Sequence, residues 1–142
     1  MKKISLSLFL IVTPLIAFSL LAKHTSKPIY LHKEKKTVRS QQDHLNQFAA
    51  DGNVILDFYA DWCGPCRRLS PLIDEVANAM PEFTFIKIHY DFFKDLAKAY
   101  QITSIPTLIF LHNGKEIGRY DGGPLTQDEL EQLLIKMYKK VK

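Results

Sequence analysis

Trp62-Cys63-Gly64-Pro65-Cys66 is the stretch that decides the fold of this chain, and it contains both of its cysteines. It directly follows an apolar run over residues 54–59 and directly precedes a segment with a helical pattern. A cysteine at such a strand-to-helix turn lies beside the free N–H groups and the positive dipole end of the helix, which stabilise a thiolate. Cys-x-x-Cys motifs at helix starts have thiol pKa values lowered from about 8.5 to roughly 3.5–7.5. The glycine lets the backbone turn, and the proline suits the first helical turn.

Redox chemistry is the interpretation that fits this cysteine pair best. The two cysteines leave none for a structural disulfide framework. Zinc takes four ligands, commonly two such pairs or one pair with two histidines at regular spacing. The chain has one pair and five scattered histidines. We therefore predict a redox-active dithiol and no metal.

Composition and charge limit the function classes. The chain has 142 residues, of which 46% are hydrophobic, enough for one domain with a core. Its formal charge of +4 comes from the first 39 residues, because 11 Lys and Arg face 14 Asp and Glu from Ser40 onward. The folded part carries no basic stripe interleaved with aromatic residues, which argues against nucleic-acid binding.

The N-terminus has the pattern of a targeting or anchoring segment. Lys2 and Lys3 precede an uncharged apolar run over residues 4–22, as in a secretory signal. As a helix this run would be about 28 Å long, just enough to cross a bilayer. A cleaved signal peptide and a retained membrane anchor both fit residues 1–22, and residues 23–36 have the composition of a basic flexible linker.

The orientation of such an anchor has two interpretations. Six Lys or Arg residues follow the apolar run and two precede it, so the positive-inside rule favours a domain that faces the cytoplasm. The signal-like start favours export, which would place the domain in the periplasm or on the extracytoplasmic side of a membrane. We favour export and keep the cytoplasmic orientation as the alternative.

Hydrophobic periodicity and turn signals predict an alternation of strands and helices after the linker. The expected strands cover residues 37–39, 54–59, 83–89, 107–111 and 116–120, and the expected helices cover residues 40–50, 63–80, 94–100 and 126–140. Asn113-Gly114 is a hairpin signal between the last two strands, and Thr126 with Glu129 forms a capping box for the last helix. This order predicts one α/β domain over residues 37–142, with a central mixed β-sheet flanked by helices on both faces.

The element order, together with Asp57-Phe-Tyr-Ala-Asp-Trp-Cys-Gly-Pro-Cys66, resembles the thioredoxin family. The resemblance covers about residues 38–142 and rests on several separated motifs. Ser104-Ile105-Pro106-Thr107 is similar to the family's cis-proline loop, and Pro71 matches its helix kink. Asn113-Gly114 matches the family's hairpin, and Gly122 matches the glycine that borders its substrate groove. The resemblance implies a thioredoxin fold.

Catalytic roles follow from the resemblance, position by position. It implies that Cys63 is the attacking nucleophile, exposed at the helix start, and that Cys66 is the resolving thiol, one turn deeper. Asp57 matches the buried acid beneath the two sulfurs; a desolvated carboxylate there has a raised pKa and can take the Cys66 proton as a general base. Lys87 matches the lysine that neighbours this acid.

The resemblance also implies a set of substrate-binding residues. A cis Pro106 would stand against the sulfurs and leave the backbone of Ile105 free to pair with an extended client segment. Trp62 would pack beside the thiols and shape the surface. The remaining expected substrate-binding residues are Gly64, Pro65 and Gly122.

The chain departs from the family pattern at positions that hold no catalytic group. Tyr59 stands where Trp is frequent, Ser104 where Gly is frequent, and His89 where an acidic or amide residue is usual. Asp121 replaces a usually apolar residue, and beside Gly122 at the groove rim it would change partner preference.

The implied activity is thiol–disulfide exchange, with protein disulfides as substrates. Gly-Pro between the cysteines resembles reducing members, whose potential lies around −270 mV, rather than strong oxidants near about −120 mV. We therefore expect a monomeric protein-disulfide reductase with no cofactor besides the Cys63–Cys66 pair, re-reduced by a membrane or soluble electron donor. The alternatives are an exported disulfide oxidase or isomerase, and a binding subunit that uses the groove without turnover.

Overall fold

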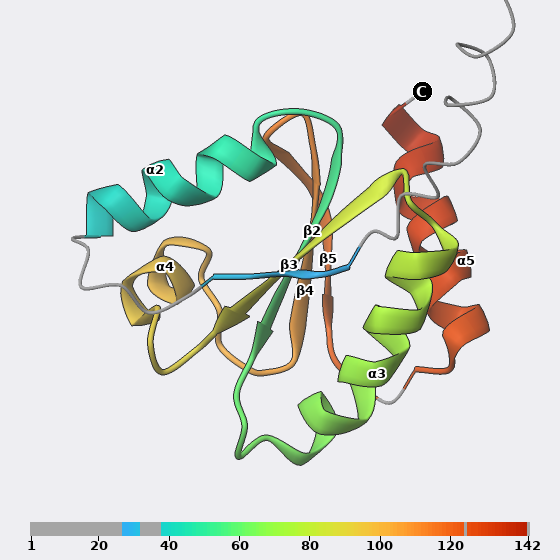
Figure 1. Cartoon of the computed structure of the whole chain (residues 1–142), viewed down its shortest axis with the longest axis horizontal. Coiled ribbons are helices and arrows are strands. Elements are labelled where there is room, and N and C mark those ends of the chain that lie inside the picture. The colour runs from blue at the N-terminus through green and yellow to red at the C-terminus, as the bar shows by residue number, and fades with distance from the viewer. Residues whose placement is uncertain (1–26, 32–37, 124, 142) are drawn as a thin grey trace, which may run out of the picture.

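The computed structural model describes residues 27–31, 38–123 and 125–141 (Figure 1). The predicted signal or anchor at residues 1–22 lies outside the described residues, as do residues 23–26 and 32–36 of the predicted linker. A search of the described part of the chain finds no helix that is both long and apolar enough to cross a bilayer.

A mixed sheet forms the centre of the molecule, in the strand order β1-β3-β2-β4-β5. Its strands are β1 (Ile29–Tyr30), β2 (Asn53–Tyr59), β3 (Phe83–His89), β4 (Thr107–His112) and β5 (Lys115–Asp121). The first three strands of this order run parallel, whereas β4 and β5 are antiparallel to their neighbours. The predicted mixed sheet is confirmed.

Helices cover both faces of this sheet, as predicted. Figure 1 shows α2 (Val38–Ala49) and α4 (Lys94–Ala99) on one side, and α3 (Gly64–Ala79) and α5 (Gln127–Tyr138) on the other. A short 3-10 turn, η1 (Lys139–Val141), continues α5. Pro71 lies inside α3, as expected from the sequence.

The alternation of side chains along the central strand positions the later site. In β2, Val54, Leu56 and Phe58 belong to the core under α2 and α4, whereas Ile55 belongs to the core under α3 and α5. Successive side chains of a strand point to opposite faces. Asp57 therefore shares the face of Ile55, which is the face that α3 covers.

Local turn signals were predicted well. The Thr126 hydroxyl accepts a hydrogen bond from the Glu129 backbone, and the Glu129 carboxylate accepts one from the Thr126 backbone, so the capping box is confirmed. Asn113 and Gly114 have φ angles of 49° and 75°. Positive φ at both central residues is the requirement of a two-residue hairpin turn with the twist of its strands.

The first strand is where the sequence interpretation was wrong. We expected it at residues 37–39, but Val38 and Arg39 belong to α2. The first strand is instead Ile29–Tyr30, inside the segment predicted to be a linker, where Ile29 pairs with Ile86 of β3. A strand of two residues shows no alternation of its own, and its pairing depends on the free edge of β3. The sheet therefore begins before residue 37.

Candidate active site

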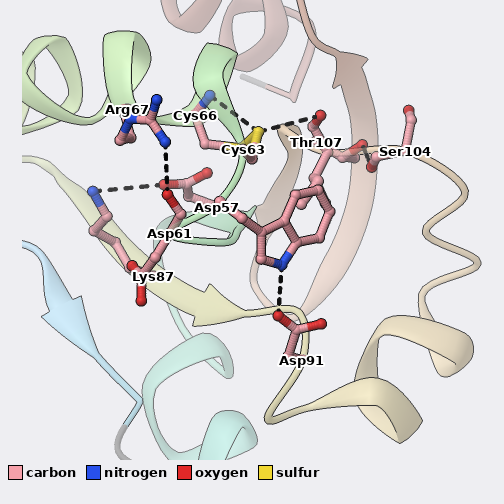
Figure 2. The surroundings of a disulfide bond; sticks show 11 residues. Asp57, Asp61, Cys63, Cys66, Arg67, Lys87, Asp91, Ser104 and Thr107 are labelled. Carbon is pink, nitrogen blue, oxygen red and sulfur yellow. Dashed lines mark hydrogen bonds and ion pairs between the residues drawn. A yellow bond between two sulfur atoms is a disulfide. The ribbon is translucent and has the colours of Figure 1, made fainter.

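A disulfide at the N-terminus of α3 forms the centre of the candidate site (Figure 2). Cys63 is the N-cap residue of the helix and Cys66 lies in its first turn, with their sulfurs 2.05 Å apart. The backbone N–H of Cys66 donates to Cys63 Sγ over 3.2 Å. Pro65 occupies the start of the helix, where it interrupts no hydrogen bond. A helix N–H directed at Cys63 would stabilise negative charge on that sulfur after reduction.

Both cysteines are covered in this oxidised form. Each has 4% of its surface exposed, because Tyr59, Ala60 and Ile105 pack around the pair. The expectation that Cys63 is the more exposed of the two is therefore wrong for the disulfide. The Ile105 carbonyl oxygen lies 3.6 Å from Cys63 Sγ and covers it on the side of the following loop.

Asp57 is a buried acid with an unusual environment. Its side chain is on the sheet face under α3, and its Oδ1 has no hydrogen-bond partner among the described residues. The Oδ2 atom lies 3.8 Å from Lys87 Nζ, and Figure 2 places Asp57 between Lys87 and the cysteines in that view. Desolvation raises the pKa of Asp57 from 3.8 to about 6, although Lys87 acts in the opposite direction and Asp74 adds to the rise. Such a carboxyl can exchange a proton near neutral pH.

Lys87 is buried rather than solvent-facing, with 1% of its surface exposed. It pairs with Asp57 because β2 and β3 are parallel and these two residues are in register. Its ammonium group donates to the Ser70 hydroxyl and lies 5.4 Å from the ring centroids of both Tyr30 and Tyr59. The sequence interpretation identified the pair but missed Ser70 and Tyr30, which come from α3 and β1.

A loop with a cis peptide bond borders the disulfide. The Ile105–Pro106 bond is cis, as the resemblance implied. The Thr107 hydroxyl donates to the Ser104 carbonyl over 2.8 Å, which ties the loop to the start of β4. Gly122 contacts this loop from the other side, because its N–H donates to the Pro106 carbonyl over 3.0 Å. A Cβ atom at Gly122 would lie 2.6 Å from Pro106 Cγ and O, so only glycine fits without a shift.

A shallow cleft of about 270 Å³ lies beside this loop, lined by Trp62, Tyr90, Thr103, Ser104 and Ile105. Trp62 is 64% exposed, and its indole N–H donates to Asp91 Oδ2 over 2.7 Å. The sequence interpretation predicted Trp62 and Ile105 here and missed Asp91. The cleft is therefore formed by an exposed aromatic ring and by the loop whose Ile105 carbonyl contacts Cys63 Sγ.

His89 forms a second group beside the motif. Its Nε2 lies 3.3 Å from Asp61 Oδ2, and its ring stacks on Phe92 at a centroid distance of 4.2 Å. Asp61 precedes Trp62 in the motif, and the Asp61 backbone carbonyl accepts a hydrogen bond from Arg67. The residue that departs from the family pattern therefore packs against the segment that carries the cysteines.

The site brings together the residues that the sequence singled out. Asp57 and Lys87 form one buried pair, Trp62 and Ile105 line one cleft, and Gly122 packs on Pro106. Among the described residues, no group of three or more His, Cys, Asp or Glu side chains is arranged to hold a metal ion. The arrangement can carry out two-electron exchange between its cysteines and another disulfide, with an acid near the pair to move a proton.

Comparison with known proteins agrees with this chemistry. The family model described as Thioredoxin matches residues 34–136. The chain is 38% identical over 98 residues to a thioredoxin of Mycoplasmoides gallisepticum, an alignment that covers 69% of this chain and 95% of that protein. It is 32% identical over 120 residues to the mitochondrial thioredoxin-2 of Schizosaccharomyces pombe, covering 84% and 87%. The crystal structure of a thioredoxin from Nicotiana alata is similar with a TM-score of 0.65 at 30% identity, covering 79% of this chain and 93% of that chain.

Proposed function

Because this chain belongs to the thioredoxin family, we propose that it reduces disulfides of exported proteins with Cys63 as the nucleophile and Cys66 as the resolving thiol. As a family member it is a thiol–disulfide oxidoreductase and a protein-disulfide reductase, which acts on disulfide-containing substrates and receives electrons from a reductase donor. The observation that carries the assignment of roles is the N–H of Cys66 directed at Cys63 Sγ. That donor favours the thiolate on Cys63.

The proposed reaction has two exchange steps. The Cys63 thiolate attacks one sulfur of the client disulfide, so a Cys63–client bond forms and the other client sulfur leaves as a thiolate. Asp57 then accepts the proton of Cys66, and the Cys66 thiolate attacks Cys63 Sγ. The client leaves as a dithiol after taking up protons, and the Cys63–Cys66 disulfide forms. Two electrons have passed from the protein to the client, and a donor dithiol restores them.

Client binding is proposed for the cleft beside the cis loop. An extended client segment would pair with the backbone at Ile105, as strands add to an exposed edge. Trp62 supplies an aromatic surface on one side of the cleft. On the other side Gly122, which has no side chain, packs closely against Pro106. Gly64 and Pro65 would contact the client at the start of α3. Because main-chain pairing does not read side chains, such a site accepts many clients.

The location is part of the proposal. Residues 1–22 would act as a signal peptide or as a retained anchor, and the domain would face the periplasm or the outer side of a membrane. The donor would then be a membrane protein or a soluble protein of that compartment. We also propose a monomer that uses no cofactor besides its own disulfide. Labelling of intact cells with a membrane-impermeant thiol reagent, after treatment with a membrane-impermeant reductant that opens the Cys63–Cys66 disulfide, tests this location, because only an exported domain would react before lysis.

The reduction potential of the full chain, equilibrated with glutathione, tests the direction of the reaction. A value near about −250 mV or below is expected, as for reducing members of the family. A value above about −180 mV would mean that the protein introduces or shuffles disulfides instead.

Cysteine variants test the assigned roles. Cys63→Ser is expected to abolish reduction of a client disulfide, whereas Cys66→Ser is expected to accumulate the Cys63–client mixed disulfide. Mass spectrometry of the trapped species identifies the sulfur that is attached. Full function of Cys63→Ser would leave only a binding role for the groove.

A further inference from the structure

The C-terminal part of α5 lies at the end of the described fold opposite the disulfide (Figure 1). The helix α3 starts at the disulfide and runs away from it for 16 residues, or about 24 Å. The hydroxyl of Tyr138 donates to the carbonyls of Val54 and Leu111, which lie at the start of β2 and the end of β4. Figure 1 shows the C-terminal end of α5 and the start of α3 at opposite ends of the fold.

This far end combines exposed apolar and basic side chains. We call it the α5-end surface and define it by Met80, Ile135, Lys136, Lys139, Lys140 and Val141. Ile135 is 54% exposed and Val141 is 36% exposed, and the three lysines are exposed. A hollow of about 250 Å³ opens there between Met80, Phe83, Ile135 and Tyr138, with Asn53, Glu82 and Lys139 at its edge. Exposed aliphatic side chains among lysines are the composition of surfaces that lie in a membrane interface.

The charge of α5 is divided along its length. Asp128 and Glu129 are in its first turn, whereas Lys136 is in its last turn and Lys139 and Lys140 follow in η1. The acidic residue at the hollow is Glu82, against three lysines in the surface. The α5-end surface therefore complements an anionic partner, and the opposite end of the same helix does not.

The path of the chain points to the same end. Since β1 runs parallel to β3 and Ile29 pairs with Ile86, residues before Ile29 approach the sheet from the side where β3 begins, at Phe83. The apolar run of the sequence ends at residue 22, five residues before Lys27. Five extended residues span at most about 18 Å. A retained anchor would therefore hold the bilayer close to the α5-end surface.

We propose that the α5-end surface rests on an anionic lipid bilayer, so that the disulfide faces away from the membrane toward its clients. The proposal rests on the proposed function in one respect, the retained N-terminal anchor. Each lysine near an anionic membrane favours the bound state by about fivefold. Ile135 and Val141 would enter the interface, where their apolar groups leave water.

Tryptophan quenching by brominated lipids tests this orientation in the full chain. Trp62 is the only tryptophan of the sequence, so Trp62→Phe with Ile135→Trp places a single reporter on the surface. Trp62→Phe with Phe92→Trp places a matched reporter near the disulfide, at a position that is 46% exposed. In vesicles of brominated phosphatidylglycerol and phosphatidylcholine, the reporter at position 135 is expected to be quenched and the reporter at position 92 is not.

Charge variants supply the matched control. Lys139→Gln with Lys140→Gln should lower the ratio of docked to undocked chain by about 25-fold, from about fivefold for each lysine. Lys94→Gln with Lys98→Gln removes the same charge from α4 and should leave quenching unchanged. High salt should abolish the quenching at position 135, because it screens exposed charges.

Several outcomes would overturn the proposal. Equal quenching at positions 135 and 92, or full quenching in purely zwitterionic vesicles, would contradict docking through this surface. A reporter at position 135 that stays unquenched, although the chain sediments with the vesicles, would also contradict docking. Cross-linking would then identify a second copy or residues 4–22 as the occupant of the α5-end surface. A chain that stays in the supernatant would refute both docking and the anchor. Client reduction by the parent chain, which keeps Trp62, in the same vesicles separates these results, since absent activity together with intact quenching of the reporter at position 135 rejects the proposed reaction alone.

Discussion

At the scale of single residues, the proton-accepting role proposed for Asp57 would link the stability of the protein to its chemistry. Burial raises the pKa of its carboxyl from 3.8 to about 6 in the folded protein. The folded state therefore holds a proton that the unfolded state releases between these two values. The contribution of this proton to the stability of the folded state is complete below pH 3.8 and is lost as the pH rises through about 6. The difference between the pKa of Asp57 in the folded and in the unfolded state corresponds to about 3 kcal/mol in the free energy of unfolding, at roughly 1.4 kcal/mol for each pKa unit.

Asp57→Asn should therefore be more stable than the parent protein at pH 8, by up to about 3 kcal/mol in the free energy of unfolding. The difference should shrink toward pH 4, where the parent acid is neutral as well. Resolution of the mixed disulfide should slow by at least about tenfold, because the amide cannot accept the Cys66 proton. Urea denaturation across pH and single-turnover kinetics measure the two effects. Asp51→Asn, in an exposed turn, is the control; a destabilised Asp57→Asn at pH 8 would contradict the argument.

At the scale of elements, the contact between the β5–α5 connection and the cis loop can be tested at one atom. Gly122→Ala would place a Cβ 2.6 Å from Pro106 Cγ and O. Relieving that overlap must shift the loop, at a cost of about 1–3 kcal/mol, which is typical of overpacking. The carbonyl oxygen of Ile105 in this loop lies 3.6 Å from Cys63 Sγ, so a shift of the loop should also lower kcat/KM for client reduction.

Gly123→Ala is the matched control for this contact. A Cβ there would meet Tyr120 Oη at 3.6 Å, an ordinary contact. Its denaturation midpoint and its kcat/KM should stay near those of the parent protein. Equal effects of the two substitutions would show that the packing of Gly122 on Pro106 does not matter.

An element could be predicted well where neighbouring residues in the sequence determine it, and poorly where residues distant in the sequence do. The hairpin at Asn113-Gly114 and the capping box at Thr126 were predicted correctly, because φ preferences and cap hydrogen bonds are local. The strand β1 was missed, because two residues carry no periodicity and Ile29 is held by an edge that only the folded sheet offers. Val38 was likewise assigned to a strand, although it begins α2.

At the scale of the whole molecule, the candidate site shows the same division. The cysteines, Asp57 and Pro106 stand in motifs that the sequence displays. The partners of Trp62 and Lys87 do not stand in such motifs, because Asp91 meets Trp62 across 29 positions and Ser70 meets Lys87 across 17 positions of the chain. Such pairs depend on the packing of α3 and the β3–α4 connection against the sheet, which no single segment encodes.

The same sheet joins two apolar cores, and this predicts how the molecule unfolds. Leu45 of α2 lies in one core and Ile73 of α3 in the other, and both are fully buried. The strands β2 and β3 contribute side chains to both cores. Loss of packing on either face therefore weakens the strands that the other face needs.

Leu45→Ala and Ile73→Ala should each lower the free energy of unfolding by about 2–5 kcal/mol, the range for cavities in packed cores. Because the strands are shared, each variant should still unfold in one transition, with Trp62 fluorescence and far-UV circular dichroism giving the same midpoint. Ile135→Ala is the control, since this side chain is 54% exposed and its truncation should change stability by no more than about 0.5 kcal/mol. If Leu45→Ala separated the two midpoints, the α2 face would be an independent unit and the shared-sheet argument would fail.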